Sequence, residues 1–458
     1  MDYIKQSNNL NSYINCLKNY KGSSLILEDF LAFIIKKANE KSLEIVRSDS
    51  FLYIKNGHSP KAIFHINIEY NKEKEEFKIS DNEKICFEGI GSSINLVGNL
   101  FVIYYLLANS KEDFDVLISS ISIHDVDGRP RDELKKVLRS ENVINLNLKQ
   151  GETIANEFSA LKLFLNQVRV KRFVPDYDYL SYRISLGGLS GGEAGHEIDK
   201  VKLNSIKLIL SIIRKIKAVV DLDIISITGG STYDYIPSEA YADFIIKSDY
   251  EGEIEKVFDL VKNEIIEKNL KYDPDMKIYL GKLDKIKLMP ITNESFNHLA
   301  SFVELIPNGT VFVNSLDDQL VSSSNLASVR SLKNYVNMIL VVRSLSEESM
   351  KSMVDKTSLA SQISSSILVE KYYIKKWSNP DSYLKDIFLK SYREIFDRDM
   401  RLINTQYSLY GSIMFSDLPV KIISLGVKYK KGDKVYTVSY EDLVNLISLL
   451  ERALYNLN

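Results

Sequence analysis

The spacing of apolar residues along the chain predicts alternating helices and strands. Between residues 24 and 39, apolar side chains recur three to four positions apart, which is the period of an amphipathic helix. Residues 62–68 are almost continuously apolar, which is typical of a strand buried on both faces. The same criteria predict strands at 44–47, 51–54 and 115–123 and a helix at 96–107. Alternating strands and helices predict an α/β sheet covered on both faces.

The pattern changes near residue 182 and changes back near residue 375. Between these points we expect strands at 182–186, 223–228 and 240–247 and helices at 199–218 and 253–269, followed by strands at 276–280 and 338–343. The α/β pattern then resumes with a helix at 382–396, a strand at 421–425 and a final helix capped by Ser439. We therefore predict one α/β domain, residues 1–182 and 373–458, interrupted by an α+β domain at 183–372.

Composition excludes several classes of protein. The formal charge is −2 and the pI about 6.3, so the chain lacks the basic surface that nucleic-acid binding requires. No apolar run is long enough to span a membrane, and the first residues lack the apolar core of a secretory signal. Two cysteines offer no disulfide framework, and five histidines are a small stock for a metalloenzyme. We expect a cytoplasmic protein that binds neither nucleic acid nor membrane.

A glycine-rich segment at 187–192 carries the most informative local pattern. Gly188, Ser190 and Gly192 match the spacing of the nucleophile elbow of serine hydrolases. A serine nucleophile needs a histidine base, and His196 follows too closely for the usual order of such triads. The glycines instead predict a tight turn with positive φ.

Separated motifs occur in one order along almost the full chain. They include Phe64-His65-Ile66-Asn67, Val143-Ile144-Asn145-Leu146-Asn147, Gly188-Leu189-Ser190-Gly191-Gly192, Ile306-Pro307-Asn308-Gly309, Val342-Arg343-Ser344 and Ile423-Ser424-Leu425-Gly426. Together they resemble the M20 metallopeptidases, most closely the aminoacyl-histidine dipeptidase branch. The resemblance implies a zinc-exopeptidase-like α/β domain that binds two zinc ions, interrupted by an α+β lid that forms a homodimer.

The resemblance also identifies the positions that hold the metal ions and the catalytic groups in that family. His65 matches a family metal ligand, whereas neutral or apolar side chains occupy most of the other positions. The bridging carboxylate falls on Glu88 or Asn95, and the catalytic base on Asp125. A carboxylate replaces the lid histidine at Glu193. The remaining ligand positions are occupied by Asn67, Val126, Asn147 and Tyr429.

These replacements predict a catalytically inactive homologue that serves as a homodimeric binding or scaffold protein and needs no cofactor. Zinc needs imidazole, thiolate or carboxylate donors, and too few remain at the family positions. One alternative is a dipeptidase or aminopeptidase with a relocated or single-metal site built on His65, Glu88, His124 and Asp125. Another is a heteromeric partner for an active paralogue.

Three lid residues are candidates for ligand binding. Arg343, Asn308 and Asn325 correspond to positions near the substrate terminus in the family. They can hold the carboxylate of a peptide or amino acid, because a guanidinium and amides donate hydrogen bonds to it. A purely structural role is the alternative.

Overall fold

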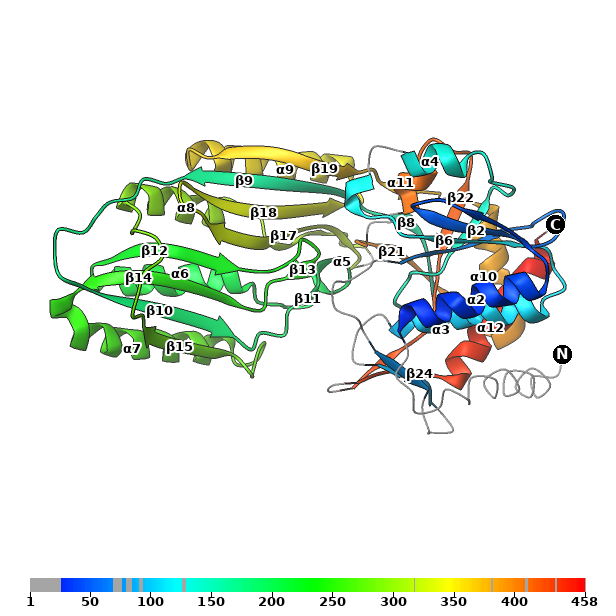
Figure 1. Ribbon diagram of the computed structural model, residues 1–458, viewed down its shortest axis with the longest axis horizontal. Coiled ribbons are helices and arrows are strands. Elements are labelled where there is room, and N and C mark those ends of the chain that lie inside the picture. Colours follow the sequence, from blue (N-terminus) through cyan, green and yellow to red (C-terminus); the bar gives the residue numbers. More distant parts are fainter. Residues whose placement is uncertain are drawn as a thin grey trace. The chain divides into compact units, whose positions relative to one another are not determined.

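The computed structural model describes residues 26–68, 76–79, 85–89, 94–125, 129–316, 318–379, 382–407, 411–432 and 435–457. The chain forms two compact units (Figure 1). The first comprises Met1–Phe158, Trp377–Asn404 and Leu409–Asn458, and the second comprises Ser159–Lys376 and Thr405–Ser408. The first boundary therefore precedes the expected one at 182/183, because β9 (Ala160–Arg169) pairs with strands of the inserted unit.

The first unit is built on a mixed nine-stranded sheet in the order β1-β2-β6-β3-β7-β22-β8-β20, with β21 beside β8. Its centre, β6-β3-β7-β22, is parallel, and the flanking pairs β1-β2, β2-β6, β22-β8 and β8-β20 are antiparallel. The strands are β1 (Glu44–Arg47), β2 (Phe51–Lys55), β3 (Ile63–Asn67), β6 (Asp115–Ser119), β7 (Asn142–Asn145), β8 (Thr153–Phe158), β20 (Trp377–Ser378), β21 (Arg401–Thr405) and β22 (Lys421–Ser424).

Helices cover both faces of this sheet (Figure 1). One face carries α2 (Leu27–Glu40), α3 (Ile94–Asn109), α10 (Tyr383–Phe396) and α12 (Tyr440–Asn456), whose apolar side chains form one core with Phe64, Ile66 and Ile118. The other face carries α4 (Arg129–Leu134) and α11 (Gly411–Phe415). The expected α/β sheet covered on both faces is confirmed.

A small second sheet and a capped helix complete this unit. The sheet has the order β23-β24-β5-β4, with β4 (Phe77–Ile79), β5 (Ile85–Gly89), β23 (Lys430–Lys431) and β24 (Tyr436–Ser439). Ser439 Oγ accepts a hydrogen bond from the Asp442 amide at 3.1 Å, which is the expected cap of α12. The strand expected at 115–123 is shorter, because β6 ends at Ser119 and a 3₁₀ turn occupies Ile123–Asp125.

The second unit contains an antiparallel nine-stranded sheet in the order β15-β10-β14-β12-β17-β18-β9-β19, with β16 beside β17. Helices α6 (Ser205–Lys217), α7 (Glu251–Asn269), α8 (Asn293–Leu305) and α9 (Glu347–Ile363) pack their apolar sides into one core on this sheet (Figure 1). The other strands are β10 (Tyr179–Gly187), β12 (Leu222–Gly229), β14 (Ala240–Lys247), β15 (Lys277–Lys282), β16 (Gly309–Val313), β17 (Leu320–Ser331), β18 (Tyr335–Ser344) and β19 (Ile367–Ile374).

Local chemistry explains two boundaries in the second unit. The helix expected from residue 199 begins only at Ser205, because Asn204 is extended and its side chain accepts from the Ile206 and Lys207 amides. At the glycine-rich turn, Gly188 has φ +74°, and a side chain there would meet the Asp275 carbonyl oxygen at 2.1 Å. The expected positive-φ turn is therefore confirmed.

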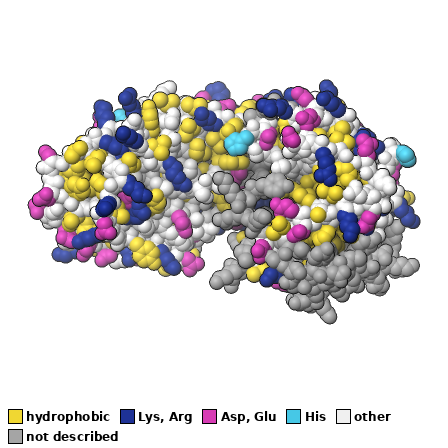
Figure 2. Space-filling view, viewed as in Figure 1, with side chains coloured by type: hydrophobic (Ala, Val, Ile, Leu, Met, Phe, Trp, Pro, Cys, Tyr) yellow, Lys and Arg dark blue, Asp and Glu magenta, His cyan; other side chains and the backbone are white. Residues whose placement is uncertain are grey.

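Among the described residues, no helix is long and apolar enough to cross a membrane. On the face drawn in Figure 2, Lys and Arg side chains are intermixed with Asp and Glu over both units.

Candidate functional site

Polar side chains lie together where the parallel strands of the first unit end. In register, Asn67 of β3 is opposite Ser119 of β6, His65 is opposite Asn145 of β7, and Ser424 of β22 is also opposite Asn145. These side chains are all buried. Ligand sites of open α/β sheets usually lie at this edge, beyond the carboxyl ends of the strands. We call these residues, with Asn147, the polar cluster; the sequence resemblance implies metal ligands at His65, Asn67 and Asn147.

Both ring nitrogens of His65 are occupied by hydrogen bonds. Nδ1 lies 3.0 Å from the Asn145 amide nitrogen, and Nε2 lies 2.8 Å from Ser119 Oγ. Because Asn145 Nδ2 is a donor, Nδ1 accepts and the ring proton resides on Nε2. Ser119 Oγ then accepts from His65 and donates to Asn67 Oδ1 at 2.7 Å. The imidazole is therefore neutral and fixed in one tautomer.

The side chain of Asn147 binds the backbone of Asn67 at both of its polar ends. The Asn67 amide donates to Asn147 Oδ1 at 2.8 Å, and Asn147 Nδ2 donates to the Asn67 carbonyl at 2.7 Å. Asn67 also binds Ile121 through both ends of its side chain, at 2.8 and 2.9 Å. Each of these two side chains both donates to a backbone carbonyl and accepts from a backbone amide, which an amide can do and a carboxylate, having no donor, cannot.

Asn145 joins the two halves of the polar cluster. Its Nδ2 donates to Asn147 Oδ1 at 2.9 Å, and its Oδ1 accepts from Ser424 Oγ at 2.6 Å. A fully bonded polar network inside a protein fixes the side chains that it joins.

The surroundings of His65 exclude water and charge. The ring is fully buried and packs edge-on against Phe415 with 5.2 Å between ring centroids. A side chain at Gly411 would meet His65 Cε1 at 2.7 Å, so the backbone of α11 closes directly over the imidazole. Burial lowers the pKa of His65 to about 3, because the charged imidazolium loses its hydration.

The other candidate residues lie outside the polar cluster. Asp125 accepts from the Ser122 amide and hydroxyl, at 2.8 and 2.9 Å, and so caps its own turn. Glu88 lies in β5 of the small sheet, opposite Thr437 and Lys78. Tyr429 packs against the core and against Tyr436. Val126 lies outside the described residues.

Asn95 differs from the other candidate residues because its buried side chain lacks hydrogen-bond partners. It lies in the first turn of α3 and is fully buried, and neither its Oδ1 nor its Nδ2 has a hydrogen-bond partner. One turn later, Asn99 binds the Leu146 carbonyl and the Val427 amide.

The side chains around His65 do not fit the two zinc ions that the sequence resemblance implies. Zinc sites use imidazole, thiolate and carboxylate ligands. Around His65 the polar atoms belong to amides and hydroxyls, and they are engaged with one another. Within the described part of the chain, no group of three or more His, Cys, Asp or Glu side chains could hold a metal ion.

The lid candidates form a second polar cluster, inside the second unit. Arg343 donates to Asp234 at 2.9 Å, and both side chains are largely buried. Asn325 donates to the Tyr235 carbonyl at 2.8 Å, and Asn308 accepts from the Leu326 amide at 2.9 Å. These contacts give Arg343, Asn308 and Asn325 structural partners within the unit.

The segment after the glycine-rich turn contributes two further side chains. Glu193 Oε1 lies 3.6 Å from His196 Nε2, and the His196 ring stacks on Tyr407 with 4.9 Å between centroids. Ser190 Oγ accepts from Lys202 Nζ at 3.0 Å. Among the described residues, no histidine accepts a hydrogen bond from Ser190 Oγ, as the base of a serine nucleophile would.

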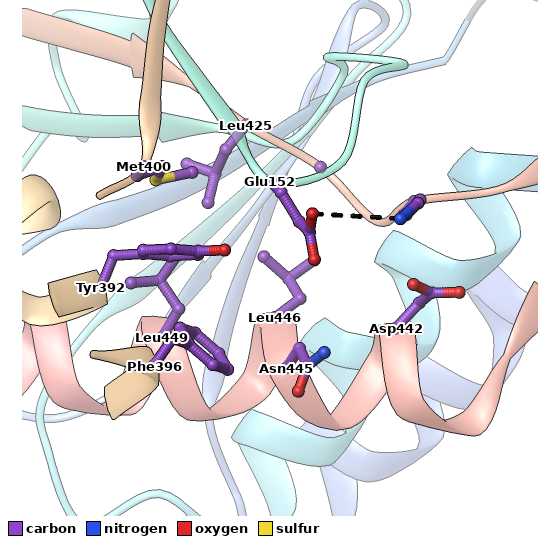
Figure 3. A pocket seen from close by; sticks show the side chains of 11 residues that line it. Glu152, Tyr392, Phe396, Met400, Leu425, Asp442, Asn445, Leu446 and Leu449 are labelled. Carbon is purple, nitrogen blue, oxygen red and sulfur yellow. Dashed lines mark ion pairs between the residues drawn. The ribbon is translucent and has the colours of Figure 1, made fainter. Parts of the chain in front are cut away.

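A small hollow lies between α10, α12 and the loop that carries Glu152 (Figure 3). Its volume is about 30 Å³, and Glu152 and Lys428 form an ion pair of 3.9 Å at its wall. A volume of this size holds one or two water molecules, so the hollow does not suit a peptide.

Sequence reasoning identified His65, Asn67 and Asn147 but missed Ser119 and Ser424, and it assigned no role to Asn145. Their positions at the ends of predicted strands could have identified them. Each of these residues ends a buried strand, and parallel strands bring such positions to one edge.

Comparisons with known proteins identify the fold. No family model matches the chain. A 189-residue stretch is 25% identical to the cytosol non-specific dipeptidase of Escherichia coli K12. This stretch covers 40% of the chain and spans 38% of the relative's length.

Solved structures match over nearly the whole chain. The aminoacylhistidine dipeptidase of Vibrio alginolyticus superposes with a TM-score of 0.65 at 14% identity, over 95% of this chain and 94% of that one. The dipeptidase Dug1p of Saccharomyces cerevisiae gives 0.51 at 10% identity, over 99% and 97%. The chain therefore has the fold of these two dipeptidases, an α/β domain interrupted by an inserted α+β domain.

Proposed function

We propose that this protein is a catalytically inactive homologue of the M20 dipeptidases that acts as a homodimeric binding or scaffold protein. The polar cluster around His65 is the observation that supports the proposal. Its amides and hydroxyls bond to one another and leave the imidazole without a free nitrogen. Two-metal hydrolysis needs anionic ligands and a carboxylate base near the ions. We place the protein in the cytoplasm, the compartment named for the Escherichia coli relative.

The residues at the implied metal-ligand positions support the proposal that catalytic activity was lost while the fold was kept. At positions where the resemblance implies carboxylates, Asn67 Nδ2 donates to the Ile121 carbonyl and Asn147 Nδ2 donates to the Asn67 carbonyl, and a carboxylate could make neither bond. Carboxylates left in a metal-free site would repel one another. Neutral amides therefore stabilise a site that operates without metal.

Removal of divalent metal is expected to leave the stability of the protein unchanged. A ligand that binds only the folded state raises the melting temperature, so its removal lowers it. We expect the same melting temperature with and without EDTA, and again after addition of zinc, in thermal scans of purified protein. Metal analysis of the same sample should find less than one zinc ion per chain.

A loss of stability on removal of metal would favour the alternative of an enzyme with a relocated or single-metal site. A melting temperature that falls by several degrees in EDTA and recovers with zinc would contradict the proposal. Turnover of any dipeptide in a panel assayed with zinc, manganese or cobalt would also contradict it, provided that Asp125→Ala abolishes that turnover.

The lid is the proposed dimer surface, within or next to the expected range 183–372. The apolar stripe of α6 does not serve this purpose, because Ile206, Ile209 and Ile213 are buried in the unit's own core. Instead, Leu359 and Ile363 of α9 are 56% and 55% exposed, and Ile367 on the edge strand β19 is 56% exposed. An exposed apolar edge is a liability that pairing across a two-fold axis removes.

We expect light scattering at micromolar concentration to give twice the chain mass of 52.4 kDa. Ile367→Asp should shift the protein toward monomer, because it places a charge in the apolar contact. Leu316→Asp is the control, since Leu316 is 93% exposed and lies between β16 and β17, and β17 is separated from β19 by β18 and β9 in the sheet order. A monomeric wild-type protein would refute the proposed dimer.

A further inference from the structure

A cavity of about 290 Å³ opens beside α2, at the same sheet edge as the polar cluster. Its wall comes from α2, from the turn between β1 and β2, and from the ends of β3 and β6. Small-molecule sites usually range from about 300 to 1,000 Å³. The cavity is therefore at the lower end, where a single amino acid or a dipeptide fits.

The floor of the cavity is apolar. In register, Leu52 of β2 is opposite Ile118 of β6, so both side chains point to the face covered by α2. Ile68 extends this surface, and Leu31 and Ile35, one helical turn apart, cover it from α2. Branched apolar side chains on three sides favour an aliphatic group of similar shape.

The rim of the cavity carries two charges of opposite sign. Arg47, the last residue of β1, is opposite Leu52 and therefore faces the cavity. Asp49 lies in the turn that follows. Among the described residues, neither the Arg47 guanidinium nor the Asp49 carboxylate forms a hydrogen bond or an ion pair, in a chain where most arginines have partners.

We propose that this cavity binds the zwitterion of an aliphatic amino acid or a short dipeptide. Arg47 receives the α-carboxylate, since a guanidinium matches the two oxygens of a carboxylate with parallel donors. Asp49 receives the α-ammonium, and the aliphatic side chain rests on Leu52, Ile68 and Ile118. The combination of an apolar floor with a rim of opposite charges selects against fatty acids and inorganic anions.

The proposed ligand site is separate from the vestigial catalytic site. His65 and Asn67 alternate with Phe64 and Ile66 along β3 and so point to the opposite face of the sheet. Ser119 borders both regions, but its hydroxyl is engaged by His65 and Asn67. Ligand binding in the cavity therefore does not depend on whether the polar cluster binds metal or catalyses a reaction.

Calorimetric titration of the full chain with L-leucine and with L-leucyl-L-leucine tests this proposal. We expect saturable binding of at least one of them. Arg47→Gln should weaken it by about ten- to a hundredfold, the usual effect of losing one charge-assisted hydrogen bond. Leucinamide and N-acetylleucine, which each lack one charge, should also bind more weakly to the wild-type protein.

Two further variants make the result specific to the cavity. Ile35→Trp should fill the cavity and abolish binding, whereas Arg401→Gln removes an exposed arginine elsewhere in the same unit and should leave binding unchanged. The melting temperature of each variant reports whether it is folded. Absence of saturable binding up to about 10 mM would overturn the proposal, since a dissociation constant beyond 1 mM corresponds to less than about 4 kcal/mol. Binding that survives Arg47→Gln would overturn it too.

Discussion

Replacing Asn147 by Asp should destabilise the first unit by about 3–5 kcal/mol at pH 7, the usual cost of a buried, unpaired charge. Asn147 Nδ2 lies 2.7 Å from the Asn67 carbonyl, so the substitution places a carboxylate oxygen against a carbonyl oxygen. The other oxygen keeps the bonds from the Asn67 amide and Asn145, but the charge remains 7% exposed and without a cation. Urea unfolding, followed by fluorescence of Trp377, measures the loss, because this only tryptophan belongs to the first unit.

The pH dependence of this cost identifies its origin. A protonated carboxyl group can donate to the Asn67 carbonyl as the amide does, so burial raises the pKa of the new side chain above its unfolded value of about 3.9. The penalty is then full above the raised folded pKa and shrinks as pH falls toward the unfolded value. Asn39→Asp, at an exposed position in α2, should cost less than about 1 kcal/mol.

Zinc provides the contrasting outcome for the same variant. A site able to hold zinc would gain a ligand from Asn147→Asp and would be stabilised by added metal. We expect no recovery of the unfolding midpoint with zinc, because the polar cluster lacks a third anionic or imidazole donor. Recovery with zinc, or a variant as stable as the wild type, would contradict a closed, metal-free network around His65.

The sequence predicted the fold well in segments where the apolar residues follow one regular spacing, either that of a helix or that of a strand. Strands 44–47 and 240–247 appear with the expected bounds, and the cap at Ser439 and the turn at Gly188 form as their local chemistry requires. The sequence pattern changes only near residue 182, whereas the second compact unit already includes β9, an ordinary alternating strand whose partners, β18 and β19, lie far along the chain. Local patterns contain no information about such pairing.

The candidate site was predictable only in outline. Replacement of carboxylates at Asn67 and Asn147 was visible from the motifs, and it indicated lost charge. The two hydrogen bonds between the Asn147 side chain and the Asn67 backbone were not visible, because they depend on the parallel register of β3 and β7. The cavity at Arg47 also escaped notice, since its lining residues are dispersed over four separate segments.

Stability of the first unit should fall steeply as the solution becomes acidic, because of His65. Burial holds the pKa of His65 at about 3 in the folded protein, whereas the unfolded chain takes up the proton near pH 6.5. The unfolded state therefore binds more protons between these values. The contribution of neutral His65 is fully present above about pH 6.5 and is lost as pH falls toward 3, at up to about 1.4 kcal/mol per pH unit.

A neutral replacement isolates this effect from other acid titrations. His65→Gln removes the titrating group at a constant cost in packing, so its stability relative to wild type should improve by about 2.5–3 kcal/mol between pH 7 and pH 4.5. Urea unfolding followed by Trp377 fluorescence at several pH values gives the difference. His124→Gln removes an exposed imidazole and serves as the control. If the His65→Gln and wild-type curves stay parallel through this range, the imidazole takes up its proton inside the folded protein, and the closed, neutral polar cluster is not the state that exists in solution.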